Sequence, residues 1–204
     1  MFKKLASEAL GISDIGRIVP PSDYDKVEAD DYVLHEDGEE IYFLIKSKKD
    51  EYCFTDRALI HVDGDSAISS KRTLRRYEYY RSPIANVALE TAGTVDLDAE
   101  IKFTIGEEAF SVDVDKRQAT QLADLYKALY AISLEVSSNA RRHATATASV
   151  DKALGAVADS RSAATAKSAD LEAMTRFVAE WLNDAHDTYV RKDFGAVFEK
   201  YINN

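Results

Sequence analysis

The middle of the chain alternates apolar and polar residues, which is the pattern of half-buried β-strands. Ile101, Phe103 and Ile105 share one face of such a segment, for example, while the residues between them are polar. Turn-forming sequences such as Asp63-Gly64-Asp65 separate the segments. The pattern predicts seven successive strands, over residues 41–46, 52–55, 58–62, about 71–80, 84–89, 100–105 and 110–114.

On both sides of the strands the apolar spacing changes to three and four residues, which is the helical period. Helices are predicted over residues 2–10 and, behind a Ser22 N-cap followed by acidic residues, over about 22–34. Leu122, Leu125 and Leu129 predict an amphipathic helix that starts near residue 115 and covers the open sheet. Strands followed by one covering helix predict an α+β fold.

Beyond residue 133 the chain becomes rich in alanine, and aromatic residues return only after residue 170. Leu171, Met174 and Val178 begin an apolar stripe at helical spacing. These features predict an α-helical hairpin that turns near residues 159–167. The chain is therefore divided into a β-domain, residues 1–132, and a helical extension, residues 133–204. A two-helix unit has too little area to be stable alone, so it is expected to dock on its own domain or on other copies.

Composition narrows the classes of function. The 204 residues include 26 Lys and Arg against 36 Asp and Glu, a net charge of −10, which argues against general nucleic-acid binding. No apolar run reaches the roughly 20 residues that span a bilayer, and Glu8 interrupts any secretory signal, so a cytoplasmic protein is expected. The single cysteine, Cys53, is expected to pack inside a strand.

The residues of catalytic and metal sites are scattered. The four histidines lack metal-ligand spacing: His35, His61, His143 and His186. The eight glycines form no phosphate-binding loop. We therefore predict neither enzyme activity nor a cofactor nor a metal.

Several separated motifs resemble the bacterial pleckstrin-homology-like (PH-like) domain family. These are the Gly-Glu before the first strand, the Lys-Asp-Glu turn, the Phe54-Thr-Asp-Arg57 tetrapeptide and the Leu59-Ile-His-Val-Asp-Gly64 ending. Residues 80–87 and 97–103 are similar to the same family, and the extension resembles that of YvbH-like members. The resemblance implies two antiparallel sheets, as a β-barrel or sandwich, closed by a C-terminal helix. It implies no particular function.

One strand is strongly basic. Residues 71–81 place Lys71, Arg75, Tyr77, Tyr79 and Arg81 on one face and Arg72 and Arg76 on the other. Both polar faces suit a solvated edge strand. The alternative is an interface with an acidic partner, such as the acidic segment, residues 22–40, of a neighbouring copy. A head-to-tail contact of that kind is able to close a ring.

Two other groups of residues are candidates for binding. The large apolar side chains of the extension are either the core of the hairpin or an interface: Phe177, Trp181, Phe194 and Phe198. The first strand connection carries Lys46, Lys48 and Lys49, which serve solubility or bind an anion.

Together these observations predict a non-catalytic PH-like binding and assembly module. It is expected to form a homo-oligomer through the β-domain and the extension, with an unidentified protein partner. The alternative is a peripheral membrane or anion-binding adaptor that uses the first hairpin or residues 71–81. Nucleic acid is not an expected partner, and membrane lipid is less favoured than protein.

Overall fold

The computed structural model describes residues 15–64, 72–91, 98–158 and 168–202. The predicted helix at 2–10, the predicted hairpin turn at 159–167 and Lys71 lie outside these residues. The chain forms two compact units. The first consists of Met1–Leu134 together with Lys192–Asn204, and the second of Glu135–Arg191.

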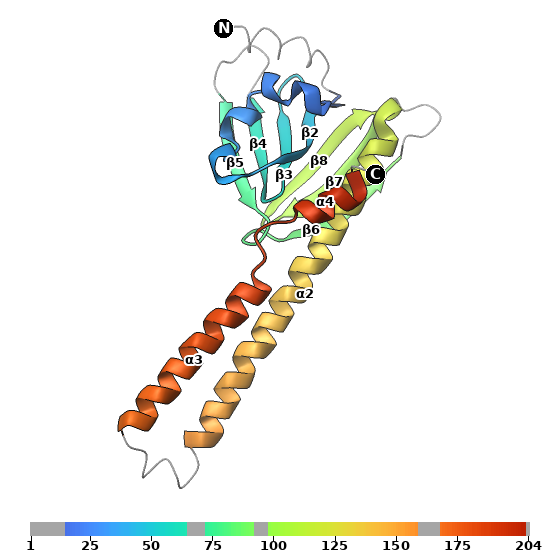
Figure 1. Cartoon of the computed structure of the whole chain (residues 1–204). Coiled ribbons are helices and arrows are strands. Elements are labelled where there is room, and N and C mark those ends of the chain that lie inside the picture. Colours follow the sequence, from blue (N-terminus) through green and yellow to red (C-terminus); the bar gives the residue numbers. More distant parts are fainter. Residues whose placement is uncertain (1–14, 65–71, 92–97, 159–167, 203–204) are drawn as a thin grey trace. The chain divides into compact units, whose positions relative to one another are not determined.

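The first unit contains a five-stranded antiparallel sheet in the order β1-β2-β3-β4-β5 (Figure 1). Its strands are β1 (Arg17–Ile18), β2 (Ile41–Lys46), β3 (Glu51–Thr55), β4 (Ala58–Gly64) and β5 (Arg72–Glu78). The strands β2 to β4 are almost entirely buried, which explains why their sequences are apolar runs rather than strict alternations. The two-residue strand β1 was not predicted, because two residues carry no periodicity.

A second, three-stranded antiparallel sheet follows in the order β6-β7-β8. Its strands are β6 (Ile84–Glu90), β7 (Asp98–Ile105) and β8 (Glu108–Asp115). Every second residue of β7 is buried, as the alternation predicts. The two-sheet α+β architecture is confirmed, but the sheets are not closed into a barrel.

The two sheets meet at Gly16. Its N–H donates to the Asp113 carbonyl at 2.8 Å, and its own carbonyl accepts from Asp115 N–H at 3.1 Å. A Cβ at this position would lie 2.8 Å from the Asp113 carbonyl oxygen and 2.7 Å from Ile45. Only glycine therefore fits the junction without displacing backbone.

The helix predicted over residues 22–34 is not present as one element. The segment instead forms three short 3₁₀-helices, η1 (Pro21–Lys26), η2 (Ala29–Tyr32) and η3 (His35–Asp37). Val27 between them is extended and 1% exposed. Val27, Ala29 and Val33 all pack into the core of the first sheet, and one α-helix cannot direct residues at that spacing to one face.

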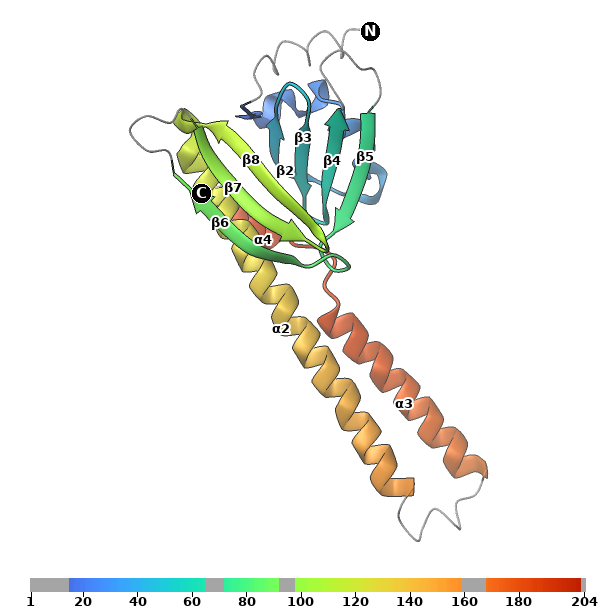
Figure 2. The same cartoon turned by 180° about the vertical axis from the view of Figure 1, so that it is seen from behind.

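The covering helix is confirmed. After η4 (Lys116–Gln118), α2 runs from Ala119 to Ala158. In the first unit it lies across one face of the β6–β8 sheet (Figure 2). Leu122, Leu125, Leu129 and Ile132 are fully buried at the predicted spacing. The helix continues without a break past residue 133, so the predicted domain boundary falls inside α2.

The C-terminal residues return to the first unit. Here α4 (Gly195–Ile202) lies against β2, and Phe194 and Phe198 are 0% exposed. The sequence-based division assigned these residues to the extension. In the second unit, the distal part of α2 and α3 (Ser168–Tyr189) form the two helices of the extension.

Candidate functional site

The arginines of β5 pair with carboxylates of the same chain. Arg76 binds Glu39 through two hydrogen bonds of 2.9 and 3.1 Å, and Arg72 lies 3.7 Å from Glu28. The other two arginines of the basic strand pair with carboxylates that are nearer in the sequence, Arg75 with Asp63 at 3.4 Å and Arg81 with Glu78 at 3.4 Å. The structure thus brings the basic strand and the acidic segment together within one chain.

Glu39 is the centre of this pairing, because its side chain is completely buried. Thr55 donates its hydroxyl to one carboxylate oxygen at 2.5 Å, and Leu34 N–H donates to the other at 2.9 Å. Burial acts to raise the pKa of Glu39, but the hydrogen bonds from Arg76, Thr55 and Leu34 outweigh it and hold the pKa below its usual value. Glu39 therefore remains a charged anchor between the 3₁₀ segment and β5.

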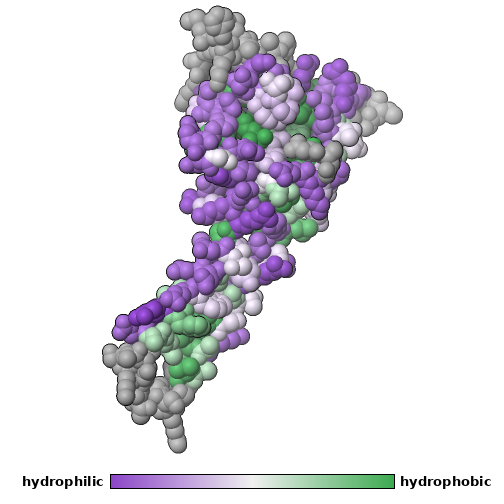
Figure 3. Space-filling model, in the orientation of Figure 1, coloured by the Kyte–Doolittle hydropathy of each residue, from purple (hydrophilic) through white to green (hydrophobic). Residues whose placement is uncertain are grey.

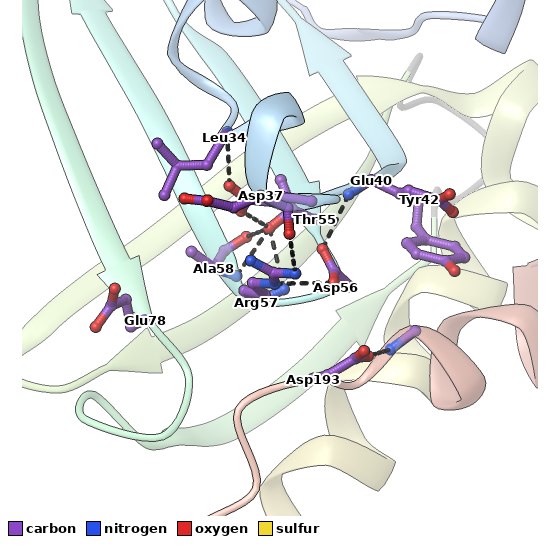
Figure 4. A network of polar contacts seen from close by, with 12 residues as sticks. Leu34, Asp37, Glu40, Tyr42, Thr55, Asp56, Arg57, Ala58, Glu78 and Asp193 are labelled. Atoms are coloured by element: carbon purple, nitrogen blue, oxygen red, sulfur yellow. Dashed lines mark hydrogen bonds and ion pairs between the residues drawn. The ribbon is translucent and has the colours of Figure 1, made fainter.

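The tetrapeptide Phe54-Thr-Asp-Arg57 forms the β3–β4 turn (Figure 4). The Thr55 hydroxyl accepts from the N–H groups of Arg57 and Ala58 at 3.1 and 2.9 Å. The Asp56 carboxylate accepts from Glu40 N–H at 3.0 Å and pairs with Arg57 at 3.2 Å. Burial raises the pKa of Asp56, and these two contacts oppose the rise. The side chains of Thr55 and Asp56 therefore form hydrogen bonds within the turn and with the residues next to it.

This turn also holds the C-terminal segment. Phe194 N–H donates to the Asp56 carbonyl at 2.7 Å, and the Asp193 carboxylate caps α4 by accepting from Gly195 N–H at 2.8 Å. Tyr79 packs edge-on to Phe194 with ring centres 5.9 Å apart, and its hydroxyl donates to the carbonyl of Ala58 at 2.8 Å. Tyr79 is 0% exposed, so this candidate interface residue is part of the core.

The candidate anion-binding lysines divide into two kinds. Lys46 is 6% exposed, and its ammonium pairs with the buried Glu51 carboxylate, which also accepts from Ala29 N–H at 2.7 Å. Lys48 and Lys49 are exposed. Of the three lysines, two are therefore available to an external anion.

The large aromatic residues of the extension lie in different units. Phe194 and Phe198 are buried in the first unit, as described above. Phe177 and Trp181 lie on α3 in the second unit, where Phe177 is 65% exposed and Trp181 is half-buried. The structure therefore leaves Phe177 and Trp181 as the surface candidates of this group.

Two of the histidines, His143 and His186, lie close together, whereas His61 lies in the first unit. His61 stacks on Tyr52 with ring centres 4.7 Å apart, and its Nε2 is 3.5 Å from Asp50. His143 and His186 are edge-on at 6.2 Å in the second unit. Within the described ranges, no three His, Cys, Asp or Glu side chains lie where they could share a metal ion. None of the helices described is long and apolar enough to cross a bilayer.

A shallow groove in the second unit was missed by the sequence analysis. It has a volume of about 380 Å³ and is lined by Ser138, Arg141, Arg142, Thr145, Ala146 and Tyr189. The signal was present in the sequence, since residues 136–150 contain two arginines and no acidic residue. In a chain of net charge −10, such a local excess of positive charge is distinctive.

Comparison with known proteins agrees with this architecture. Residues 9–133 match the family described as Bacterial PH domain, and residues 144–204 match the one described as YvbH-like oligomerisation region. The chain is 54% identical, over the full length of both chains, to Uncharacterized protein YvbH of Bacillus subtilis (strain 168). It is 34% identical over 99 residues to Uncharacterized protein YjqA of the same organism, covering 48% of this chain and 78% of that protein.

A solved structure shows the same similarity. A PH-domain-containing protein from Exiguobacterium sibiricum 255-15 is 47% identical, with a TM-score of 0.85, and the match covers 93% of this chain and 100% of that one. The resemblance noted in the strand motifs and in the extension is thereby confirmed. The chain belongs to the bacterial PH domain family and carries a YvbH-like extension.

Proposed function

We propose that the protein is a non-catalytic PH-like module that self-associates through its helical hairpin. One observation carries the proposal: the second unit has almost no core of its own. Among its described side chains, residues 135–157 and 171–191, Ala185 alone is buried. Folded units of ordinary stability bury most of their apolar surface, so this hairpin requires a further packing partner.

The exposed apolar surface lies mainly along α3. We call the apolar face of α3 the α3 stripe, and it consists of Leu171, Met174, Phe177, Val178, Trp181, Leu182 and Ala185, of which all but Ala185 are at least partly exposed. At 100° per residue these positions span an arc of about 140°, which is wider than the seam needed to pack one neighbouring helix. The two most exposed members of the stripe are Phe177, at one margin, which is 65% exposed, and Leu171, which is 57% exposed. Apolar side chains are visible along the hairpin in Figure 3.

A second copy of the same hairpin is the partner that fits best. The family description of residues 144–204 is an oligomerisation region. The distal part of α2 supplies only a thin apolar seam, Val150 and Leu154, beside the large residues of α3. Two hairpins packed with their α3 stripes facing each other would form a four-helix bundle with an isologous interface.

The test is a substitution at the margin of the stripe. Phe177→Asp places a charge where we expect the α3 stripes of two copies to meet. It leaves the residues between α2 and α3 of the same chain unchanged. Ala179→Asp is the matched control, because Ala179 is exposed on the opposite side of the same helix. Light scattering and analytical ultracentrifugation would measure the solution mass of each full-length variant.

We expect an oligomer for the unmodified chain and for Ala179→Asp, and at least a tenfold weaker association for Phe177→Asp. Far-UV circular dichroism verifies that α3 remains helical in both variants. A monomeric unmodified chain, or an equal mass for both variants, would contradict the proposal. Arg75→Glu tests the β-domain separately, whereas Arg76 is unsuitable because its substitution would break the internal pair with Glu39.

A further inference from the structure

We infer that the arginine groove of the second unit is a binding site for a phosphate group. The groove is the one defined above by Ser138, Arg141, Arg142, Thr145, Ala146 and Tyr189. Neither family description assigns a ligand, and the α3 stripe does not include these residues.

The placement of the groove residues follows from helical geometry. Ser138, Arg141, Arg142 and Thr145 are spaced i, i+3, i+4 and i+7, which places them on one face of α2. Tyr189, at the end of α3, lines the groove from the other helix. The site therefore requires both helices of the hairpin, and all of its residues belong to the same unit.

The two guanidinium groups are not used elsewhere in the described structure. The ion pairs described for this unit join Arg176 to Glu172, His186 to Asp187 and Arg191 to Glu135, and none involves Arg141 or Arg142. Both arginines are exposed, and the chain from 136 to 150 contains no carboxylate that could neutralise them. An anion that lies between the two guanidinium groups is attracted to both of them.

The neutral groups of the groove favour an oxyanion over a simple halide. The hydroxyls of Ser138 and Tyr189 are able to donate hydrogen bonds, and each guanidinium presents a planar fork that matches two oxygens of a phosphate. Thr145 does not add a donor, because its hydroxyl already donates to the Arg141 carbonyl at 2.9 Å. Four groups with free donors thus surround one groove.

Inorganic phosphate is the probe, and the full-length protein is the sample. Calorimetric titration and thermal unfolding would be compared in phosphate and in chloride at equal ionic strength, so that general screening is the same. The test variant is Arg141→Gln with Arg142→Gln. The matched control is Arg176→Gln, an exposed arginine of α3 that does not line the groove.

We expect saturable phosphate binding that weakens at least tenfold in the double variant and is unchanged in Arg176→Gln. Circular dichroism would verify that both variants retain their helix content. No saturable binding, or equal binding in all three proteins, would overturn the proposal. So would a double variant that changes only the oligomer mass, since the arginines would then belong to the contact between copies.

The phosphate could be a free anion or the headgroup of a lipid. Co-sedimentation with phosphatidylcholine vesicles, with and without phosphatidic acid, distinguishes these sources. Binding only to the phosphatidic acid vesicles, lost in the Arg141→Gln, Arg142→Gln variant, identifies a headgroup. Phosphate binding without co-sedimentation identifies a free phosphate, and both results support the site.

Discussion

Removal of the Phe198 ring tests whether the C-terminal helix is an integral part of the first unit. Phe198 is 0% exposed, stacks on Tyr42 with ring centres 5.3 Å apart and lies 6.2 Å from Tyr79. Tyr42 is half-buried, and this burial, with the nearby Glu199 carboxylate, raises the pKa of its hydroxyl to about 12. Phe198→Ala leaves a cavity between these two tyrosines.

The expected cost is large. Replacing a fully buried phenylalanine by alanine costs about 3–5 kcal/mol, from lost transfer free energy and the cavity that remains. For a chain of this length each kcal/mol lowers Tm by about 2–4 °C, so the expected decrease is about 6–20 °C. The free energy of undocking sets an upper limit, because α4 will detach when the cavity costs more than its docking contributes.

Because the free energy of undocking α4 limits the cost, a double variant tests the docking more sharply than one variant alone. If α4 docks as a unit with Phe194, the double variant Phe194→Ala, Phe198→Ala will cost no more than undocking, and the two single costs will not add. Urea unfolding gives the free energies, and hydrogen exchange reports the amide protection of residues 195–202. Glu199→Ala is the control on the same helix, because it removes only an exposed 3.3 Å contact with the Tyr42 hydroxyl.

The reasoning would be refuted by a loss below about 1 kcal/mol for Phe198→Ala, together with unprotected α4 amides in the unmodified protein. Additive single costs would refute the narrower claim that Phe194 and Phe198 anchor one cooperative element. A cost for Glu199→Ala as large as that of Phe198→Ala would also contradict the assignment of the stability to the buried ring.

Two further predictions concern the first unit and one the hairpin. Gly16→Ala should destabilise the protein by about 1–3 kcal/mol, since the new Cβ would collide with the Asp113 carbonyl. Gly155→Ala should instead stabilise α2 by up to about 1 kcal/mol, because nothing lies within 4 Å of the new Cβ. Thermal unfolding of the two variants should therefore show Tm shifts of opposite sign. Glu39→Gln should cost about 2 kcal/mol at neutral pH, because Arg76 loses its buried bidentate partner and keeps only the longer 3.8 Å contact with Glu78. The pKa of Glu39 is lowered in the folded protein, so its contribution is present above the unfolded pKa of about 4.3 and is lost as the pH falls through the folded value. Urea unfolding between about pH 2.5 and 6 should accordingly depend less steeply on pH in Glu39→Gln, and an unchanged slope would contradict this assignment.

The strands and the covering helix were predictable because each leaves a period in the sequence. The alternation at Ile101 and Phe103 and the spacing of Leu122 and Leu125 depend on local geometry alone. The 3₁₀ segment was not predictable, because its acidic residues and N-cap resemble the start of a helix, while the burial of Val27 depends on the sheet below it.

The candidate surface residues were predicted less well than the strands, because their environment depends on residues that are distant in the sequence. The basic strand and the acidic segment were both recognised, but the sequence does not say whether opposite charges meet within a chain or between chains. In the structure the Arg76–Glu39 pair joins them within one chain. Tyr79 was a candidate interface residue, and Phe194 and Phe198 were left open between the core of the hairpin and an interface, because large aromatic residues suit both. Their burial becomes visible only when residues more than 100 positions apart are brought together.

Because the C-terminal residues belong to the first unit, the hairpin is an insertion into that unit and not a tail. The folding of the hairpin therefore affects the docking of α4. Residues 135–191 interrupt the first unit, and closing a disordered loop of that length, about 57 residues, costs about 3–4 kcal/mol of chain entropy. A folded hairpin removes that cost, because Arg191 and Glu135, at its two ends, are joined by an ion pair of 2.6 Å. If a second copy is what completes the packing of the hairpin, self-association will also favour docking of α4. Hydrogen exchange of residues 195–202 should then slow as the protein concentration rises, and Phe177→Asp should abolish this dependence without touching α4. Exchange that is independent of concentration in an associating protein would show that the hairpin holds its ends together without a partner.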